Sequence, residues 1–374
     1  LILPELEDLL GLVSEVAKAK SEALGIPPYQ ALLDSYEPDI KIEQLDALFD
    51  DYALFLPPFL EDVLKRQSGW PIPHLPQGPF LKPRQVVLCR RMAEAVGFDF
   101  STGRLDATLH PFSGGIPEDS RITTRYDEAD FTSAMMGVLH ETGHAMYERG
   151  RPLKWRYQPV GETAGLGMHE SQSLIVEMQA SRSRSFFRWA APVIRDSFAG
   201  SGKGWDADNL YRLATRVERS FIRVDADEVT YPAHVALRYR LERAMIDGDL
   251  LPRDLPSAWE DQFKQLLAIS PPNDQHGCLQ DIHWYDGAWG YFPTYSIGAM
   301  AAAQLFAAAR ESDSNIVSAL GRGNFSPLMR WLRKNVHDLG ARFTTNEILQ
   351  QATGQTLKPE AFKAHLRTRY LDEA

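Results

Sequence analysis

The chain has 374 residues and a formal net charge of −10 at neutral pH, with 44% hydrophobic and 24% charged residues. This length allows a large buried core, this composition excludes a disordered chain, and the even spread of Lys and Arg argues against a nucleic-acid-binding surface. The two cysteines, Cys89 and Cys278, lie far apart and form no metal-type pair, which favours a reducing compartment and hence the cytoplasm.

Apolar residues recur every three or four positions along most of the chain, which predicts a mainly α-helical protein. The first predicted helix is acidic and amphipathic, so no signal peptide is expected, and no apolar run reaches the length of a membrane span. Asp130, Pro83, Pro192 and Pro256 stand near expected helix starts. The predicted helices cover 4–24, 42–67, 83–97, 130–149, 168–188, 190–199, 207–223, 231–247, 256–268, 294–311, 315–321, 326–336, 346–353 and 359–371.

Strand-like sequence is sparse and precedes the helix predicted at 130–149. Residues 104–110 and 120–126 have alternating or β-branched character and flank a turn rich in Gly and Pro, which predicts a small β-hairpin. The Pro-rich segment 70–80 reads as an irregular connector and a candidate boundary between two lobes.

Two histidines lie one helical turn apart in the sequence His140-Glu141-Thr142-Gly143-His144. Residues four apart share a helix face, so both imidazoles can reach one cation. Glu141 lies about 100° around the helix from His140, where it can accept a proton from a water molecule whose acidity the ion raises. The alternative is a pair of solvated or core histidines, but the apolar neighbours indicate burial, and buried histidines need partners. The pattern therefore predicts a catalytic metal site.

A catalytic zinc ion keeps three protein ligands and one open position, so a third ligand is expected. The segment that follows offers Glu162, His169, Glu170 and Glu177. Glu170 is favoured by its spacing of 26 residues from His144 and by its place near the start of a second helical pattern. Glu162 is interpreted as a loop acid, and Glu177 as either a surface charge or a hydrogen-bond partner of a ligand.

The sequence resembles the M32 family of metallocarboxypeptidases, whose type member is the thermostable Taq-type carboxypeptidase. The motifs that carry this resemblance follow one another in order over nearly the whole chain. They are HPF at 110–112, DSRIT at 119–123, HETGH at 140–144, HES at 169–171, IRVDADE at 222–228, GCLQDIHW at 277–284 and FPTYSIG at 292–298.

The resemblance implies a mainly α, two-lobed fold with a deep substrate groove and a small β-hairpin or sheet before the metal-binding helix. Residues 1–374 are then expected to form a single M32-type catalytic domain, without the additional N-terminal helices that help roof the groove in family members. The resemblance further implies a homodimer, with His140, His144 and Glu170 as metal ligands and Glu141 as general base.

Peptide hydrolysis also needs donors for the developing oxyanion, and an exopeptidase must hold a free carboxylate. His283 and Tyr295 are the candidate oxyanion donors, by analogy with related peptidases that bind zinc through two histidines and a glutamate. For Tyr295 the alternative is a core aromatic. The candidates for the carboxylate are Arg121, Arg219 and Arg223, or else these form structural ion pairs, Arg121 with Asp119 and Arg223 with Asp225 and Asp227.

Three further residues are predicted to contact the substrate. His110 can hydrogen-bond a substrate carbonyl or cap the turn that follows it, and His234 can line the groove or pack between helices. Tyr291 is a further candidate contact to the substrate terminus.

The predicted function is metal-dependent removal of single residues from peptide C-termini, with broad preference and poor tolerance of proline. The expected cofactor is one divalent ion per chain, Zn²⁺ or alternatively Co²⁺, since both suit nitrogen and carboxylate ligands. Peptides are the expected partners, and neither nucleic acid nor membrane is. The rivals are an endopeptidase or dipeptidyl carboxypeptidase with the same metal site, and a catalytically silent peptide-binding protein with structural zinc.

Overall fold

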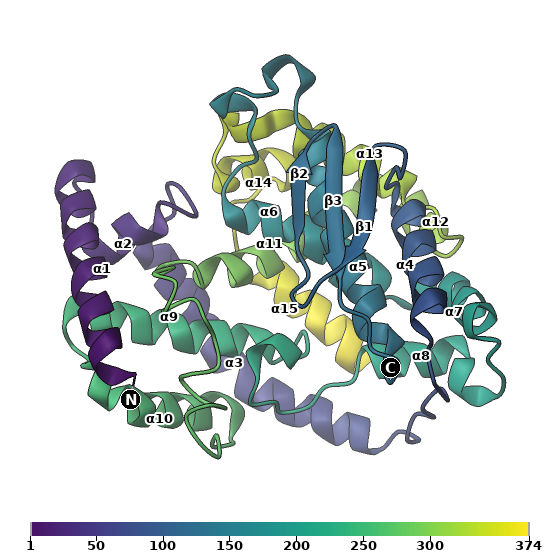
Figure 1. Cartoon of the computed structure of the whole chain (residues 1–374), viewed down its shortest axis with the longest axis horizontal. Helices are drawn as coiled ribbons and strands as arrows, with labels where there is room; N and C mark the ends of the chain where they lie inside the picture. Colours follow the sequence, from purple (N-terminus) through teal and green to yellow (C-terminus); the bar gives the residue numbers. More distant parts are fainter. Residues whose placement is uncertain (1, 373–374) are drawn as a thin grey trace. The chain divides into compact units, whose positions relative to one another are not determined.

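The computed structural model describes residues 2–372, which form two compact units assembled from alternating stretches of the chain (Figure 1). The first unit combines the residues up to 70, residues 217–297 and the residues from 363 onward. The second unit combines residues 71–216 and 298–362. None of the helices in the described part has the length and apolarity needed to cross a membrane.

The first unit is built from helices whose apolar residues repeat with the helical period. In the longest of them, α3, the buried residues Leu45, Phe49, Tyr52, Leu56 and Phe59 recur every three or four positions. This burial stabilises one helix over a stretch that contains two prolines, as the prediction for 42–67 required. The helices of this unit are α1 (Leu3–Leu24), α2 (Pro28–Leu33), α3 (Ile42–Ser68), α9 (Tyr231–Asp247) and α10 (Leu255–Leu267).

The second unit combines helices with a three-stranded sheet, against which α5 packs (Figure 1). Its helices are α4 (Lys82–Val96), α5 (Phe131–Gly150), α6 (Leu166–Leu174), α7 (Arg184–Phe198), α8 (Ala207–Ala214), α12 (Asn315–Leu320), α13 (Ser326–Asn335) and α14 (Thr345–Thr353). A π-helix, η3 (Ile175–Ser181), continues α6. Both α11 (Pro293–Ser312) and α15 (Glu360–Arg367) have residues in each unit.

The sheet confirms the predicted β-structure but not the predicted pairing. Its strands are β1 (Gly103–Ala107), β2 (Ser113–Ile116) and β3 (Asp119–Thr124), in the order β1-β3-β2. The first and third strands pair in parallel, whereas the segment expected to be a turn supplies β2, which pairs antiparallel with β3. Gly115 has a φ of 99°, and a Cβ there would lie 2.1 Å from the Asp119 carbonyl oxygen, so a glycine is needed beside this tight turn.

Most predicted helices are confirmed, and the differences have local causes. The helix predicted at 168–188 continues through the π-helix and ends at Ser181, and the next helix starts at Arg184 with Ser183 as its cap. Pro192 therefore lies inside α7 instead of near a helix start. The helix predicted at 207–223 ends at Ala214, and α2 was not predicted, because its six residues are too few to show a period.

Candidate metal centre

Helix α5 is fixed at its start and along one face. The Asp130 side chain caps it, accepting hydrogen bonds from the backbone N–H groups of Thr132 (2.8 Å) and Ser133 (3.2 Å). Ala134, Val138 and Ala145 belong to a core cluster shared with β3 and α4. Because this face is packed, the histidine-bearing face is turned toward α6 and η3.

Two glycines let Glu170 come close to the histidines. A Cβ on Gly143 would lie 2.5 Å from the Gln172 carbonyl oxygen, so only glycine lets α5 and α6 approach so closely. A Cβ on Gly298 would lie 2.6 Å from Cγ of Glu170 itself. As a result Glu170 Oε2 lies 3.4 Å from Nε2 of His144 and 3.7 Å from Nε2 of His140.

This arrangement fits a metal ion. One atom each of His140, His144 and Glu170 lie within 4.8 Å of one another, and residues 2–372 contain no second such group. Ligand atoms about 2.1 Å from a tetrahedral ion lie about 3.4 Å apart, close to the separations here. Two imidazoles and a carboxylate are also the donor set of many catalytic zinc sites. The side chains are only partly buried, with exposed fractions of 23% for His140 and 14% for His144.

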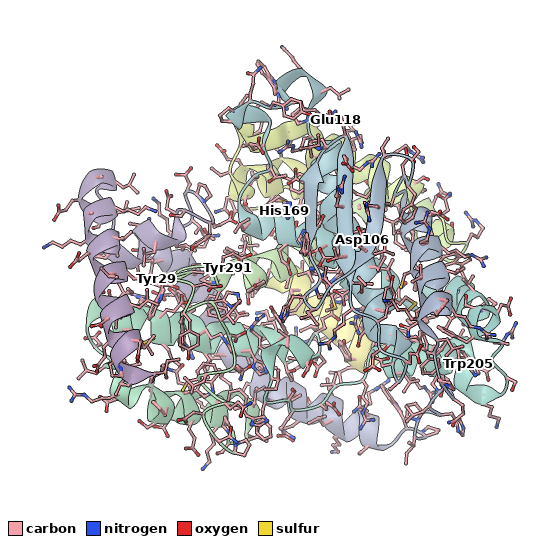
Figure 2. All side chains as sticks on the ribbon, in the orientation of Figure 1. Tyr29, Asp106, Glu118, His169, Trp205 and Tyr291 are labelled. Carbon is pink, nitrogen blue, oxygen red and sulfur yellow. The ribbon has the colours of Figure 1, made fainter. Side chains whose placement is uncertain are left out.

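Hydrogen bonds orient both imidazoles. His144 Nδ1 lies 3.1 Å from the His169 carbonyl oxygen, which can only accept, so Nδ1 carries the proton and Nε2 is left to bind a metal. His140 Nδ1 lies 3.0 Å from Glu177 Oε2, which orients the ring in the same way. His169 itself, labelled in Figure 2, directs its Nε2 to Glu148 at 3.0 Å.

The site is rich in negative charge. Glu141, Glu170 and Glu177 all interact electrostatically with His140, and Arg182 supplies one positive charge at 2.8 Å from Glu177. Burial opposes ionisation of Glu177, but Arg182 and His140 outweigh it and lower the Glu177 pKa to about 2. Burial raises the pKa of Glu141 to about 7. Although burial opposes the charged form of His140, Glu170 and Glu177 raise its pKa to about 10, so its imidazole holds a positive charge that a divalent cation would replace.

The contact between Glu177 and His140 leads to a prediction about metal affinity. Glu177→Gln is expected to weaken metal binding by about 10–100-fold, because the amide cannot replace the carboxylate that orients the imidazole and raises its basicity. The measurement is competition with a chromophoric chelator. Glu311→Gln, at an exposed position of α11, is the matched control and should bind as the wild type does. Unchanged affinity in Glu177→Gln would contradict the assigned contact.

The first unit brings three other predicted residues together. His283 Nε2 lies 3.0 Å from the Tyr295 hydroxyl, and the Tyr291 ring lies 5.5 Å from the His283 ring and 5.3 Å from the Tyr295 ring. All three side chains are partly exposed. The structure thus brings the two candidate oxyanion donors together with Tyr291, whereas the three candidate metal ligands belong to the second unit.

Each arginine predicted to bind a carboxylate already pairs with one in the protein. Arg121 lies 2.6 Å from Asp119, as the ion-pair alternative expected, and Arg219 pairs with Glu61. Arg223 does not pair with its sequence neighbours Asp225 and Asp227. It is buried and binds Asp281, 58 residues away, at 2.7 Å.

The two remaining predicted contacts differ in exposure. The His110 side chain is exposed, and its backbone carbonyl accepts a hydrogen bond from the Thr108 hydroxyl at 2.8 Å. The His234 side chain is fully buried against Phe263, so its position favours the helix-packing alternative.

Sequence reasoning missed a polar cluster behind His283. Arg238, Glu242 and Asp281 are buried or partly buried; Arg238 and Glu242 lie in none of the quoted motifs, and Asp281 lies in GCLQDIHW but received no role. The available signal was the spacing of His234, Arg238 and Glu242, which places three polar residues on one face of a helix with many apolar neighbours.

Comparison with known proteins gives consistent matches over the chain. Residues 1–370 match the family described as "Carboxypeptidase Taq (M32) metallopeptidase". The chain is 38% identical to thermostable carboxypeptidase 1 of Thermus thermophilus, over 98% of this chain and 73% of that protein. It is 37% identical to carboxypeptidase 1 of Bacillus subtilis, over 92% and 68% respectively.

Solved structures agree with these matches. Metallocarboxypeptidase 1 of Trypanosoma cruzi superposes with a TM-score of 0.96 at 40% identity, covering 98% of this chain and 77% of that chain. An M32 carboxypeptidase of Deinococcus radiodurans superposes with a TM-score of 0.92 at 36% identity, covering 99% and 74%.

Proposed function

Because this chain belongs to the M32 family of metallopeptidases and is a metal-dependent carboxypeptidase, we propose that its metal is zinc and that His140, His144 and Glu170 bind it. The observation that carries this proposal is the convergence of one atom from each residue within 4.8 Å, with Glu141 next in sequence to the first ligand. Two imidazoles and one carboxylate leave a tetrahedral ion one open position.

Glu141 acts as the general base in this proposal. When bound, the ion makes water more acidic and polarises the scissile carbonyl. The Glu141 carboxylate accepts the proton of the attacking water and then delivers it to the departing amine. Burial raises the pKa of Glu141 in the metal-free protein, which favours its holding the proton between the two halves of this task.

His283 and Tyr295 are proposed to donate hydrogen bonds to the oxyanion of the tetrahedral intermediate. Burial and the nearby Arg223 lower the pKa of His283 to about 4, so the imidazole is neutral and donates one N–H. In the 3.0 Å contact between His283 Nε2 and the Tyr295 hydroxyl one group donates to the other, so the oxyanion would replace this contact as the acceptor.

The substrate's free carboxylate is proposed to bind an arginine, with His110 and Tyr291 as further substrate contacts. Arg121 and Arg219 take part in partly exposed ion pairs, which are worth little and can be exchanged for a substrate carboxylate. The Arg223 guanidinium already donates hydrogen bonds to Asp281 and to the Tyr231 hydroxyl, both at 2.7 Å. A substrate carboxylate that bound Arg223 would therefore be a second carboxylate on the same guanidinium.

We also propose that the protein acts on peptides as a cytoplasmic homodimer. Cys89 and Cys278 are free and buried, which is consistent with a reducing compartment. The homodimer is the state that the family resemblance implies, and light scattering coupled to gel filtration measures it directly.

The proposed function is tested with two peptides that differ only at the C-terminus. A peptide with a free carboxylate is expected to lose single residues stepwise, and its C-terminally amidated form to be cleaved at least about 100-fold more slowly, because the arginine loses its charged partner. Mass spectrometry of a time course gives both rates. Equal cleavage of the two peptides would favour an endopeptidase, and release of residue pairs a dipeptidyl carboxypeptidase.

A further inference from the structure

His283 lies in a long irregular segment that needs tertiary contacts to be ordered. Between the end of α10 at Leu267 and the start of α11 at Pro293 the chain forms neither helix nor strand. Each residue of such a segment loses conformational entropy when it is fixed. A side chain that must donate to one point in space therefore depends on the groups that hold the backbone on either side of it.

Helix α9 supplies contacts on both sides of His283. Arg238 donates from Nε to Asp281 Oδ2 at 2.7 Å, and Asp281 precedes His283 by two residues. Glu242 accepts from the indole N–H of Trp284, the residue after His283, at 2.8 Å. Arg238 and Glu242 lie one turn apart on the same face of α9, so one rigid helix fixes both flanks.

Each of the two contacts is reinforced. On one side Arg223 also binds Asp281, at 2.7 Å, so two guanidinium groups hold one carboxylate. On the other side Glu242 accepts from the backbone N–H of Gly290 at 3.1 Å, and Gly290 immediately precedes Tyr291. A Cβ on Gly290 would lie 2.8 Å from the backbone nitrogen of Leu33, so the segment is seated tightly on the end of α2.

Glu242 completes its bonding with the Tyr29 hydroxyl, which donates to Oε2 at 2.7 Å. Tyr29 and Tyr291 are labelled in the same part of the first unit in Figure 2. All three donors to Glu242 are neutral groups, and the carboxylate is fully buried, so it is costly to keep there. Burial raises its pKa to about 7. If this position served only packing, an apolar or amide side chain would fill it at a lower cost in free energy. The buried carboxylate therefore indicates that its hydrogen bonds fix the geometry of the segment.

We infer that Glu242 and Asp281 are positioning residues that hold His283, and with it the His283–Tyr295 pair, in the geometry needed to stabilise the oxyanion. This inference rests on the proposed role of His283. Neither residue needs to touch the substrate. Their effect on catalysis passes through the backbone at residues 281–290, whose two ends α9 fixes.

The test is a double-mutant cycle between Glu242→Gln and His283→Ala, with kcat and KM measured on one peptide substrate. Glu242→Gln is expected to lower kcat by about 10–100-fold and to change KM less than threefold, because a displacement of about 1 Å costs this much in rate. In the His283→Ala background the same substitution should change kcat less than twofold. Glu260→Gln, at an exposed position of α10, is the matched control and should match the wild type.

The outcomes separate the inference from the proposed function beneath it. If the two substitutions multiply their effects, Glu242 does not act through His283, and the inference is overturned. The same conclusion follows if Glu242→Gln leaves kcat unchanged. If His283→Ala itself leaves kcat unchanged, the oxyanion role of His283 fails and the inference falls with it. Should Glu242→Gln not fold, Trp284→Phe removes the indole donor together with part of the buried ring, and must reproduce the coupled loss of kcat.

Discussion

Glu141→Gln is expected to lower kcat for peptide hydrolysis by about 10⁴-fold, the upper end of what a general base contributes. The amide has the shape of the carboxylate but cannot accept a proton from the attacking water. Because Glu141 is not one of the three converging ligands, metal content should stay at one ion per chain. Steady-state release of the C-terminal residue, together with elemental analysis of the same sample, measures both quantities.

Two outcomes would count against the role of Glu141. Retention of more than a tenth of wild-type kcat would mean that another group accepts the proton. Loss of the metal would mean that Glu141 is a ligand. A wild-type protein that binds zinc yet is as inert as Glu141→Gln would instead support the silent peptide-binding protein with a structural ion.

Glu170→Ala is expected to weaken metal binding by far more than the about 10–100-fold that loss of an orienting partner such as Glu177 costs, because it removes a direct ligand. Activity should fall in proportion to the metal lost. Glu162→Ala is the control from the same segment. Glu162 is an exposed loop acid that pairs with Arg151, so this variant should keep both metal and activity.

Competition with a chelator, carried out on the three variants in one titration series, ranks their metal affinities. The expected order of affinity is Glu162→Ala equal to the wild type, then Glu177→Gln, then Glu170→Ala as the weakest. If Glu170→Ala bound zinc as tightly as Glu177→Gln, a different residue would have to be the third ligand, and His169 would be the next candidate by position.

The helices could be predicted because their signal is local. In α3 the buried residues Leu45, Phe49, Tyr52, Leu56 and Phe59 recur every three or four positions, and Asp130 stands at the start of α5 as a capping residue should. The presence of strands could be predicted but their pairing could not. The parallel pairing of β1 with β3 depends on the path of the chain between them, which the local sequence pattern does not specify. The π-helix was missed because its wider turn has no distinct apolar period.

The convergence of the three candidate metal ligands could be predicted because two of them share one helical turn and the third lies in a recognisable motif. The hydrogen-bond partners of Arg223 and Glu242 could not be predicted. Arg223 lies two residues from Asp225 yet binds Asp281, and the bond depends on how a long irregular segment folds back. Nothing in the local sequence distinguishes Glu242 from an acid on a helix surface. Its burial depends on three hydrogen-bond donors that are distant in the sequence.

The most direct measurement is anomalous diffraction from zinc-loaded crystals, collected on both sides of the zinc absorption edge. A single strong anomalous peak is expected about 2.0–2.2 Å from His140 Nε2, His144 Nε2 and a carboxylate oxygen of Glu170. Glu141 should lie beside the peak without binding it. A peak bound by other side chains, or one that leaves Glu170 beyond bonding distance, would contradict the assignment of this centre.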